Sequence, residues 1–544
     1  MIHRYVFHND RLVEIEQVRL SPGQAGLLSG WGLFTTMRIF QGEAFAYERH
    51  WRRLEKDAAL IRLPMPYTAA KVRVHLHEVI RANNVTEGSA RIYLVYNQVG
   101  FWRSDEPQPQ TDLIIYSAPL PEYREPVRLG LRAHGRHAAS PLAGVKSISW
   151  LPNVWAVAEA QSAGFDEVVL LNERGEVAEC TAANIFAVKN GKILEVSPDI
   201  PVARARSVVS AKGKIVTPGL VDAHVHVFEG MGPIPVNADL YCLERGVTTA
   251  VDTGSTGYAG IAAFKKYVIR PSATRIYALL DINGFGVMMG LAGEYGNLDW
   301  VNSQSTARAA EENKPDVVGI KCRLSRETTG PNDLEVLKRA LEAADASHLP
   351  LMVHIGDSYS PLREIISRMR KGDVLTHCLN GRPNGILDAN RKLLPEVLHA
   401  RQQGVFFDLG HGSNSFDFDV AEECLQQNFI PDTISSDLAA TSINGPTFDL
   451  ITTVSKFLPL GLSLDQVIER VTVRPTRVFN FGVELGSLRP GTVADISIIE
   501  VREGTFVFAD TDGKKRTGRQ KLQSAATIRG GRLYVNRSED LVNG

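Results

Sequence analysis

The sequence has few cysteines and no long apolar run, and each shortage excludes a class of protein. Its five cysteines stand far apart and form no CxxC pair, which argues against a disulfide framework or a thiolate zinc site and fits a reducing compartment. No stretch reaches the roughly 18 consecutive apolar residues that a membrane-spanning helix needs. The start, MIHRYVFHNDRL, is too polar for a signal peptide. We therefore expect a cytoplasmic protein without a membrane partner.

An excess of charge of either sign is also missing. The formal net charge is −1 over 544 residues, which offers no electrostatic attraction to nucleic acid or to an anionic membrane surface. Apolar residues make up 44% of the chain, an ordinary share for a globular protein that buries large cores. At roughly 150 residues per domain the length allows three or four domains, or fewer if one α/β barrel takes about 250 residues or more.

The first third of the chain alternates strand and helix patterns. A short hairpin is predicted around His8-Asn9-Asp10, where two strand-like runs flank a turn. Helices are predicted where apolar residues recur at helical spacing with charges on the opposite face. The predicted helices cover residues 45–61 and 69–81, with another that begins near Pro152, and the predicted strands cover residues 5–7, 11–14, 90–96, 111–116 and 129–133.

A series of motifs follows in a defined order. Lys146-Ser147 comes first, then Glu159-Ala160, then Gly164-Phe165-Asp166-Glu167, and then the segment from Glu179 to Phe186. With these motifs, residues 1–193 resemble the class IV pyridoxal-phosphate (PLP) enzymes, which include branched-chain and D-amino-acid aminotransferases and aminodeoxychorismate lyase. The resemblance implies an α+β region of that type.

The same resemblance implies roles for three residues. Lys146, which by position alone would be taken for a surface lysine, corresponds to the Schiff-base lysine. Glu179 corresponds to the carboxylate that keeps the pyridine nitrogen protonated, and Arg53 to the arginine that binds the cofactor phosphate. The family's later segment, where a helix N-terminus completes the phosphate site, does not follow here. We therefore expect a PLP site that is incomplete.

After Ser207 the pattern changes. The segment VVSAKGKIVTPGLVDAHVHV ends an apolar strand at His224-Val225-His226. Residues i and i+2 of a strand point to the same face, so both imidazoles are able to reach one metal ion. An HxH pair alone is a weak signal, and its weight depends on further ligands downstream.

Further polar residues recur where predicted strands end. These strands alternate with helical stretches, as in a (β/α)₈ barrel, whose functional residues gather at the C-terminal ends of the strands. Lys321 is informative, because an ammonium at the end of an apolar strand is costly to desolvate; it either snorkels to water or is carboxylated by CO₂. The predicted strands cover residues 248–252, 275–281, 317–321, 351–354, 374–377, 405–408 and 433–437, and the residues at or just past their ends are Lys321, His354, His377, His411 and Asp437.

Residues 207–544 resemble the amidohydrolase superfamily, and within it the dihydroorotase-like deacetylases. The matching motifs are Gly219–His226, Phe407–Gly412, Ser436-Asp437 and Leu485–Asp495. The resemblance implies an α/β fold, a TIM (β/α)₈ barrel with a small β-sandwich, preceded by the incomplete α+β class IV region. We expect a small α+β domain over residues 1–120, a partial large PLP-enzyme domain over 121–193, a β-sandwich from 194–216 and 480–544, and the barrel over 217–479.

The amidohydrolase resemblance also implies a site with two divalent metal ions, expected to be zinc. Histidines, one aspartate and a carboxylated lysine would hold them: His224, His226 and Asp437 the first ion, His354 and His377 the second, with Lys321 as the bridge. The metals would lower the pKa of a water that attacks an amide or ester of a small molecule, and Asp437 would move the proton to the leaving group. Arg323 and His411 are candidate ligands for a substrate carboxylate or oxyanion.

Several alternatives to the hydrolase stay open: a PLP-dependent transaminase or lyase, a bifunctional fusion, and a chimera in which neither half works. A homo-oligomer is expected by analogy with both families alone. The junction Asn184–Pro201 could close the first region or open the second. Our hypothesis is that residues 167–197 serve as the last strands of the first region and also replace the missing first strands of the β-sandwich.

Overall fold

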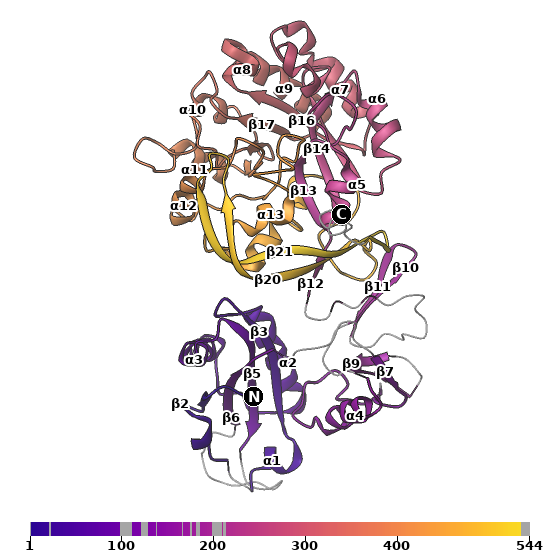
Figure 1. The fold of residues 1–544 in the computed structure, drawn as a ribbon, viewed down its shortest axis with the longest axis vertical. Helices are drawn as coiled ribbons and strands as arrows, with labels where there is room; N and C mark the ends of the chain where they lie inside the picture. Colours follow the sequence, from indigo (N-terminus) through magenta and orange to yellow (C-terminus); the bar gives the residue numbers. More distant parts are fainter. Residues whose placement is uncertain are drawn as a thin grey trace. The chain divides into compact units, whose positions relative to one another are not determined.

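The protein divides into two compact units (Figure 1). The first contains Met1–Ile185 and Ser197–Ser210, and the second contains Phe186–Val196 and Ala211–Gly544. The computed structural model describes residues 2–20, 23–97, 111–120, 129–137, 139–165, 167–173, 177–180, 185–197, 209, 211 and 214–534. Within these ranges no helix is both long and apolar enough to cross a membrane.

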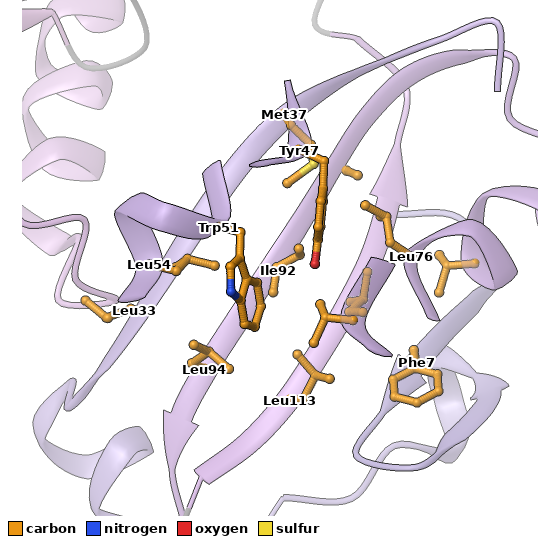
Figure 2. Close-up of a cluster of buried hydrophobic side chains, with 14 of the residues drawn as sticks. Phe7, Leu33, Met37, Tyr47, Trp51, Leu54, Leu76, Ile92, Leu94 and Leu113 are labelled. Atoms are coloured by element: carbon orange, nitrogen blue, oxygen red, sulfur yellow. The ribbon is translucent and has the colours of Figure 1, made fainter. Parts of the chain in front are cut away.

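The first unit is built on an antiparallel sheet of six strands in the order β2-β1-β6-β5-β3-β4. One face of the sheet packs against helices α2 (Tyr47–Ile61) and α3 (Ala69–Ala82), and Figure 2 shows Trp51 and Leu54 of α2 against Ile92 and Leu94 of the sheet. Both helices begin and end near the predicted residues, because apolar side chains at helical spacing needed one face to bury. The strands are β1 (Tyr5–His8), β2 (Arg11–Glu14), β3 (Gly32–Phe40), β4 (Glu43–Ala44), β5 (Glu87–Tyr96) and β6 (Thr111–Ala118).

Strand β3 was not predicted, although it lies inside the sheet between β5 and β4. Its sequence, GLFTTMRIF, has seven buried residues out of nine. A strand covered on both faces does not show the alternation of apolar and polar residues that marks a half-exposed strand. The local sequence pattern therefore did not mark this segment as a strand.

A smaller sheet of three strands follows in the first unit. Strands β7 (Leu129–Arg132) and β8 (Glu167–Leu171) are parallel, and β9 (Val177–Cys180) pairs antiparallel with β8. Helix α4 (Leu151–Ser162) connects the parallel pair and packs through Ala156 and Ala160 on Val168 and Leu170. A crossover helix of this kind is what two parallel neighbours require.

The second unit contains a parallel sheet of seven strands in consecutive order. Between the last and first strands lies the extended segment 433–438, joined by parallel bridges from Thr433 to Asp408 and from Leu438 to Val225. This segment closes the barrel in the place of an eighth strand, which agrees with the predicted (β/α)₈ fold. The strands are β13 (Leu220–Val225), β14 (Val247–Gly257), β15 (Arg275–Asp281), β16 (Val317–Leu324), β17 (Leu351–Ile355), β18 (Val374–Thr376) and β19 (Phe406–Phe407).

Helices follow most of the barrel strands. Apolar residues from several strands and from the segment 478–485 form one core cluster, with Phe479 and Phe481 packed against Val221 and Tyr277. The helices are α5 (Ala238–Tyr241), α6 (Ile261–Phe264), α7 (Ser303–Glu312), α8 (Arg326–Thr329), α9 (Asp333–Ser347), α10 (Leu362–Ile366), α11 (Pro395–Gln402), α12 (Phe418–Gln426), α13 (Leu450–Ser455), α14 (Leu464–Glu469) and α15 (Pro475–Val478).

A four-stranded antiparallel sheet, β12-β20-β21-β22, completes the second unit. Strands β20 (Ile496–Ala509) and β21 (Lys515–Arg529) are long and run beside the barrel (Figure 1). The other two are β12 (Ile215–Pro218) and β22 (Arg532–Tyr534).

The junction between the two regions forms a hairpin of β10 (Ile185–Lys189) and β11 (Lys192–Ser197). This hairpin contacts the second unit: Ile193 N–H donates to Thr492 O at 2.9 Å, and Val188 packs against the cluster around Ile496. Residues 186–196 thus belong to the second unit, as the hypothesis expected of replacement strands, but they are not shared with the first unit. The hypothesis fails for residues 167–180, because β8 and β9 pair with β7 inside the first unit.

Candidate metal centre

Two histidines and one aspartate meet where the barrel closes. His224 lies in β13 and His226 just after it, and Asp437 lies in the closing segment. Both histidine Nε2 atoms are 3.3 Å from Asp437 Oδ1. The three residues offer ligand atoms that all lie within 4.8 Å of one another. They were predicted together from sequence positions more than 200 residues apart.

The backbone around Asp437 is shaped to hold its carboxylate there. Asp437 has a φ of 46° and donates its N–H to His224 O at 2.7 Å. A Cβ on Gly412 would clash with Asp437 Oδ2, so a larger residue there would displace the carboxylate. Burial raises the pKa of Asp437, whereas a positive charge on His224 or a hydrogen bond from His226 would lower it.

The Nδ1 atoms of both histidines have their own partners, which orient the rings. His224 Nδ1 lies 3.0 Å from Thr376 Oγ1, and His226 Nδ1 lies 3.1 Å from Ser255 Oγ. Burial and the nearby Lys321 lower the pKa of His224, so its imidazole is neutral. A neutral ring with one nitrogen held by a hydrogen bond presents the other as a metal ligand.

Lys321 occupies the middle of the same cluster. Its side chain is 1% exposed, and its Nζ lies 3.3 Å from His224 Nε2 and 3.5 Å from Met352 Sδ. Burial lowers the pKa of Lys321 to about 8. A lysine in this range is partly the free amine, which is the form that reacts with CO₂.

His354 and His377 stand beside this group. Their ring centroids are 4.1 Å apart, and His377 is 5.0 Å from His224. His377 Nδ1 lies 2.7 Å from Gly410 O, whereas its buried Nε2 has no hydrogen-bond partner among the described residues. Burial lowers the pKa of His377 to about 4. A buried acceptor without a partner is costly, and a bound cation would satisfy it.

The side chains as a set suit a divalent cation. Imidazole nitrogens and a carboxylate are ligands that zinc and other divalent ions accept, and no cysteine takes part. Lys321 in its ordinary cationic form would repel such an ion, whereas a carboxylated Lys321 would add oxygen ligands. The residues therefore fit a divalent metal ion, and the structure brings together all six that were predicted to bind one.

Two buried aspartates support the cluster and had not been assigned a role. Asp408 accepts hydrogen bonds from Thr376 Oγ1 at 2.7 Å and from Ser435 Oγ at 2.7 Å, and lies 3.4 Å from His224 Nδ1. Asp222 accepts from Ser436 N–H at 3.0 Å, and burial raises its pKa to about 7. Asp408 stood at the end of a predicted strand, which was the available signal.

Arg323 lies two residues beyond Lys321 on β16 and so points to the same face of the strand. Its guanidinium pairs with the buried carboxylate of Glu294, and its backbone N–H donates to Tyr295 Oη at 3.1 Å. The side chain of Arg323 is 25% exposed. It is thus held at the same ends of the strands as the cluster and stays partly accessible.

His411 is fully buried, and contacts within the protein engage both of its ring nitrogens. Its Nδ1 lies 2.8 Å from Gly412 O and its Nε2 2.7 Å from Lys456 Nζ. Lys456 Nζ also donates to Pro446 O at 2.9 Å and Ala509 O at 2.8 Å. A substrate would have to displace one of these contacts to reach His411.

The residues expected to bind PLP lie in the first unit. Lys146 is exposed, with its Nζ 5.8 Å from the centre of the Phe34 ring. Arg53 donates to Gly144 O at 2.9 Å and lies 3.6 Å from the carboxylate of Asp57. Glu179 is in β9, and its side chain lies outside the described residues.

Among the described residues, one carboxylate opposes the expected phosphate site. Asp57 Oδ2 lies beside Arg53 and 3.4 Å from Lys146 N. Its negative charge opposes a phosphate group at the arginine that was expected to bind it. The described residues therefore do not fit the cofactor, and we derive no reaction step through it.

Comparisons with known proteins divide the chain at the same place. The model of the amidohydrolase family matches residues 215–521, and that of amino-transferase class IV matches residues 32–201. A deacetylase of Enterococcus faecalis is 35% identical over 370 residues, which are 68% of this chain and 99% of that protein. The matched class IV aminotransferases are covered over 65–68% of their own length.

Two solved structures resemble the second unit. One is an adenine deaminase, 34% identical with a TM-score of 0.60, and the match covers 65% of this chain and 96% of that one. The other is a dihydroorotase, 29% identical with a TM-score of 0.61, and the match covers 65% and 94%.

Proposed function

The chain belongs to the amidohydrolase family and is a metal-dependent hydrolase, and we propose that its second unit hydrolyses an amide or cyclic amide of a small molecule. Ester hydrolysis is the related alternative, since attack of water on an ester carbonyl gives the same kind of tetrahedral intermediate. The observation that carries the proposal is the meeting of His224, His226 and Asp437 beside buried Lys321, with the unpartnered His377 Nε2 nearby.

We propose that this centre holds two zinc ions: His224, His226 and Asp437 would hold one, His354 and His377 would hold the other, and carboxylated Lys321 would add oxygen ligands. A metal bound there supplies a Lewis acid and lowers the pKa of water. The neutral state of the histidines, which burial favours, keeps their ring nitrogens free for ligation.

Asp437 is the proposed proton carrier. Its Oδ1 lies 3.3 Å from the Nε2 atoms of His224 and His226, so the carboxylate is placed to accept the proton of the attacking water. The same carboxylate then delivers the proton to the leaving nitrogen. Arg323, partly exposed on the same strand face, is proposed to bind an anionic end of the substrate, with Glu294 fixing its orientation.

The test is hydrolysis by the purified full chain, with metal content measured in parallel. Substrates would include N-acetyl amino acids, a cyclic amide and adenine, so that deacetylation, ring opening and deamination are distinguished. We expect His226→Asn to lose activity and metal, and His399→Asn, which changes an exposed histidine on α11, to retain both. Equal activity in the two variants would overturn the proposed centre.

For the first unit, we propose that it lacks PLP-dependent activity, because Asp57 sits beside Arg53. The chain should show no Schiff-base absorbance that borohydride removes after incubation with PLP. Such an absorbance, if lost in Lys146→Ala, would instead establish a bifunctional enzyme.

A further inference from the structure

A cavity of about 690 Å³ lies at the N-terminal ends of barrel strands, away from the candidate metal centre. Its lining includes Val317 at the start of β16, Pro350 just before β17, Asp373 just before β18 and Phe406 at the start of β19. Lys321 lies four residues after Val317 on the same strand, which corresponds to about 13 Å. A small molecule held in this cavity is therefore remote from the candidate metal centre.

The inner wall of the cavity is apolar. Val317, Val318, Ala344 and Val478 line it, and all four are buried. The volume is within the range of about 300–1,000 Å³ that small-molecule sites occupy, and such sites combine an apolar wall with a few polar groups. The polar groups here are concentrated among the exposed lining residues.

Among the described residues, two cationic side chains of the lining have no ion-pair partner. Arg370 binds both lining acids, Asp373 at 2.7 Å and Asp345. Lys314, another lining cation, pairs with Glu311 at 2.5 Å. Lys371 and Arg477 make no ion pair and no side-chain hydrogen bond within the described part of the chain, and both are exposed.

We propose that this cavity binds a small organic dianion of the phosphate-monoester class. The organic group would cover the apolar wall, and the phosphate would bind Lys371 and Arg477. A phosphate monoester carries about −1.5 to −2 charges at neutral pH, which matches the two unpartnered cations. An arginine fork suits phosphate oxygens, and lysine adds a second point charge. The site is independent of the hydrolase reaction and gives the protein a second ligand.

Calorimetric titration of the full chain tests this site with three probes. Phenyl phosphate has both the charge and the apolar group, inorganic phosphate has only the charge, and phenol has only the apolar group. We expect phenyl phosphate to bind at least about tenfold more tightly than the other two, because phenol lacks the charge-assisted contacts and inorganic phosphate lacks the apolar group.

A matched pair of double variants locates the binding. Lys371→Gln with Arg477→Gln should weaken phenyl phosphate at least tenfold. Arg363→Gln with Lys392→Gln removes the same charge from exposed residues outside the cavity and should leave the affinity unchanged. The proposal is overturned if the wild type does not bind the probe, or if the cavity variant binds it as the wild type does, which would place it elsewhere, as at a metal ion. An equal loss in both double variants would show a dependence on net charge alone and would also overturn it.

Discussion

Replacing Lys321 by methionine should have opposite effects on stability and on metal binding. Burial lowers the pKa of Lys321 from 10.5 to about 8, so keeping the ammonium in the barrel costs about 3 kcal/mol at neutral pH, at about 1.4 kcal/mol per pKa unit. Methionine has a similar length and no charge to desolvate. It loses the contact with His224 Nε2 at 3.3 Å, a change of about 1 kcal/mol. The metal-stripped variant should thus be more stable than metal-stripped wild type by about 2 kcal/mol.

The same substitution should abolish metal retention and activity. Removing a partner that only orients a ligand typically reduces metal affinity by about 10–100-fold, and the loss of a bridging ligand should exceed that. The assay is denaturant unfolding of chelator-treated proteins, followed by metal analysis after reconstitution. Lys338→Met, on an exposed side chain of α9, serves as the control and should retain metal. A metal-stripped Lys321→Met that is less stable than wild type, or that retains full metal content, would refute the reasoning.

Three further outcomes follow from the site. Asp408→Asn should destabilise the protein by about 1–3 kcal/mol. The carboxylate of Asp408 accepts hydrogen bonds from two hydroxyl groups, whereas the NH₂ group of asparagine would point hydrogens at them. Metal titration of this variant should show an affinity about 10–100-fold lower. Gly412→Ala should reduce kcat, because its Cβ would collide with Asp437; Gly513→Ala, also at positive φ but with open space around it, should leave kcat unchanged. Burial lowers the pKa of Lys456 to about 7, so the unfolded chain binds more protons between pH 7 and about 10 and stability rises with pH across that window. Lys456→Met should show a smaller rise, since the part that remains comes from Lys321, whose pKa is also lowered. Unfolding midpoints measured from pH 7 to 10 would check this, and a rise equal to that of the wild type would contradict it.

Much of the second unit could be read from local patterns. The barrel strands are recognisable in the sequence as short apolar runs separated by helical segments. The strand over residues 275–281 begins and ends at the predicted residues. The polar residues at the strand ends were visible for the same reason, because a parallel barrel places all these ends on one face. Because this geometry follows from the barrel topology, the alternation of predicted strands and helices was sufficient to group the candidate ligands.

Other features depended on contacts that no local pattern contains. Strand β3 is buried on both faces and shows no period, and the hydroxyls that Asp408 binds come from the segments around residues 376 and 433–435. His411 carried a recognisable motif, but the structure alone shows that Lys456 engages it. The position of Asp57 Oδ2 3.4 Å from Lys146 N likewise emerges only in the folded structure, since 89 residues separate the two.

The junction shows the same division between local and tertiary information. The sequence of residues 184–201 has the turn and strand chemistry of either neighbour, because a β-hairpin is specified by a few residues. The hairpin belongs to the second unit because its backbone pairs with residues 491–494 and because Val188 packs against the cluster around Ile496. Local chemistry indicated strands at the junction and identified the residues that could bind metal. Long-range hydrogen bonds and burial decided which unit the hairpin joined and which groups surround each ligand, since those contacts join residues hundreds of positions apart.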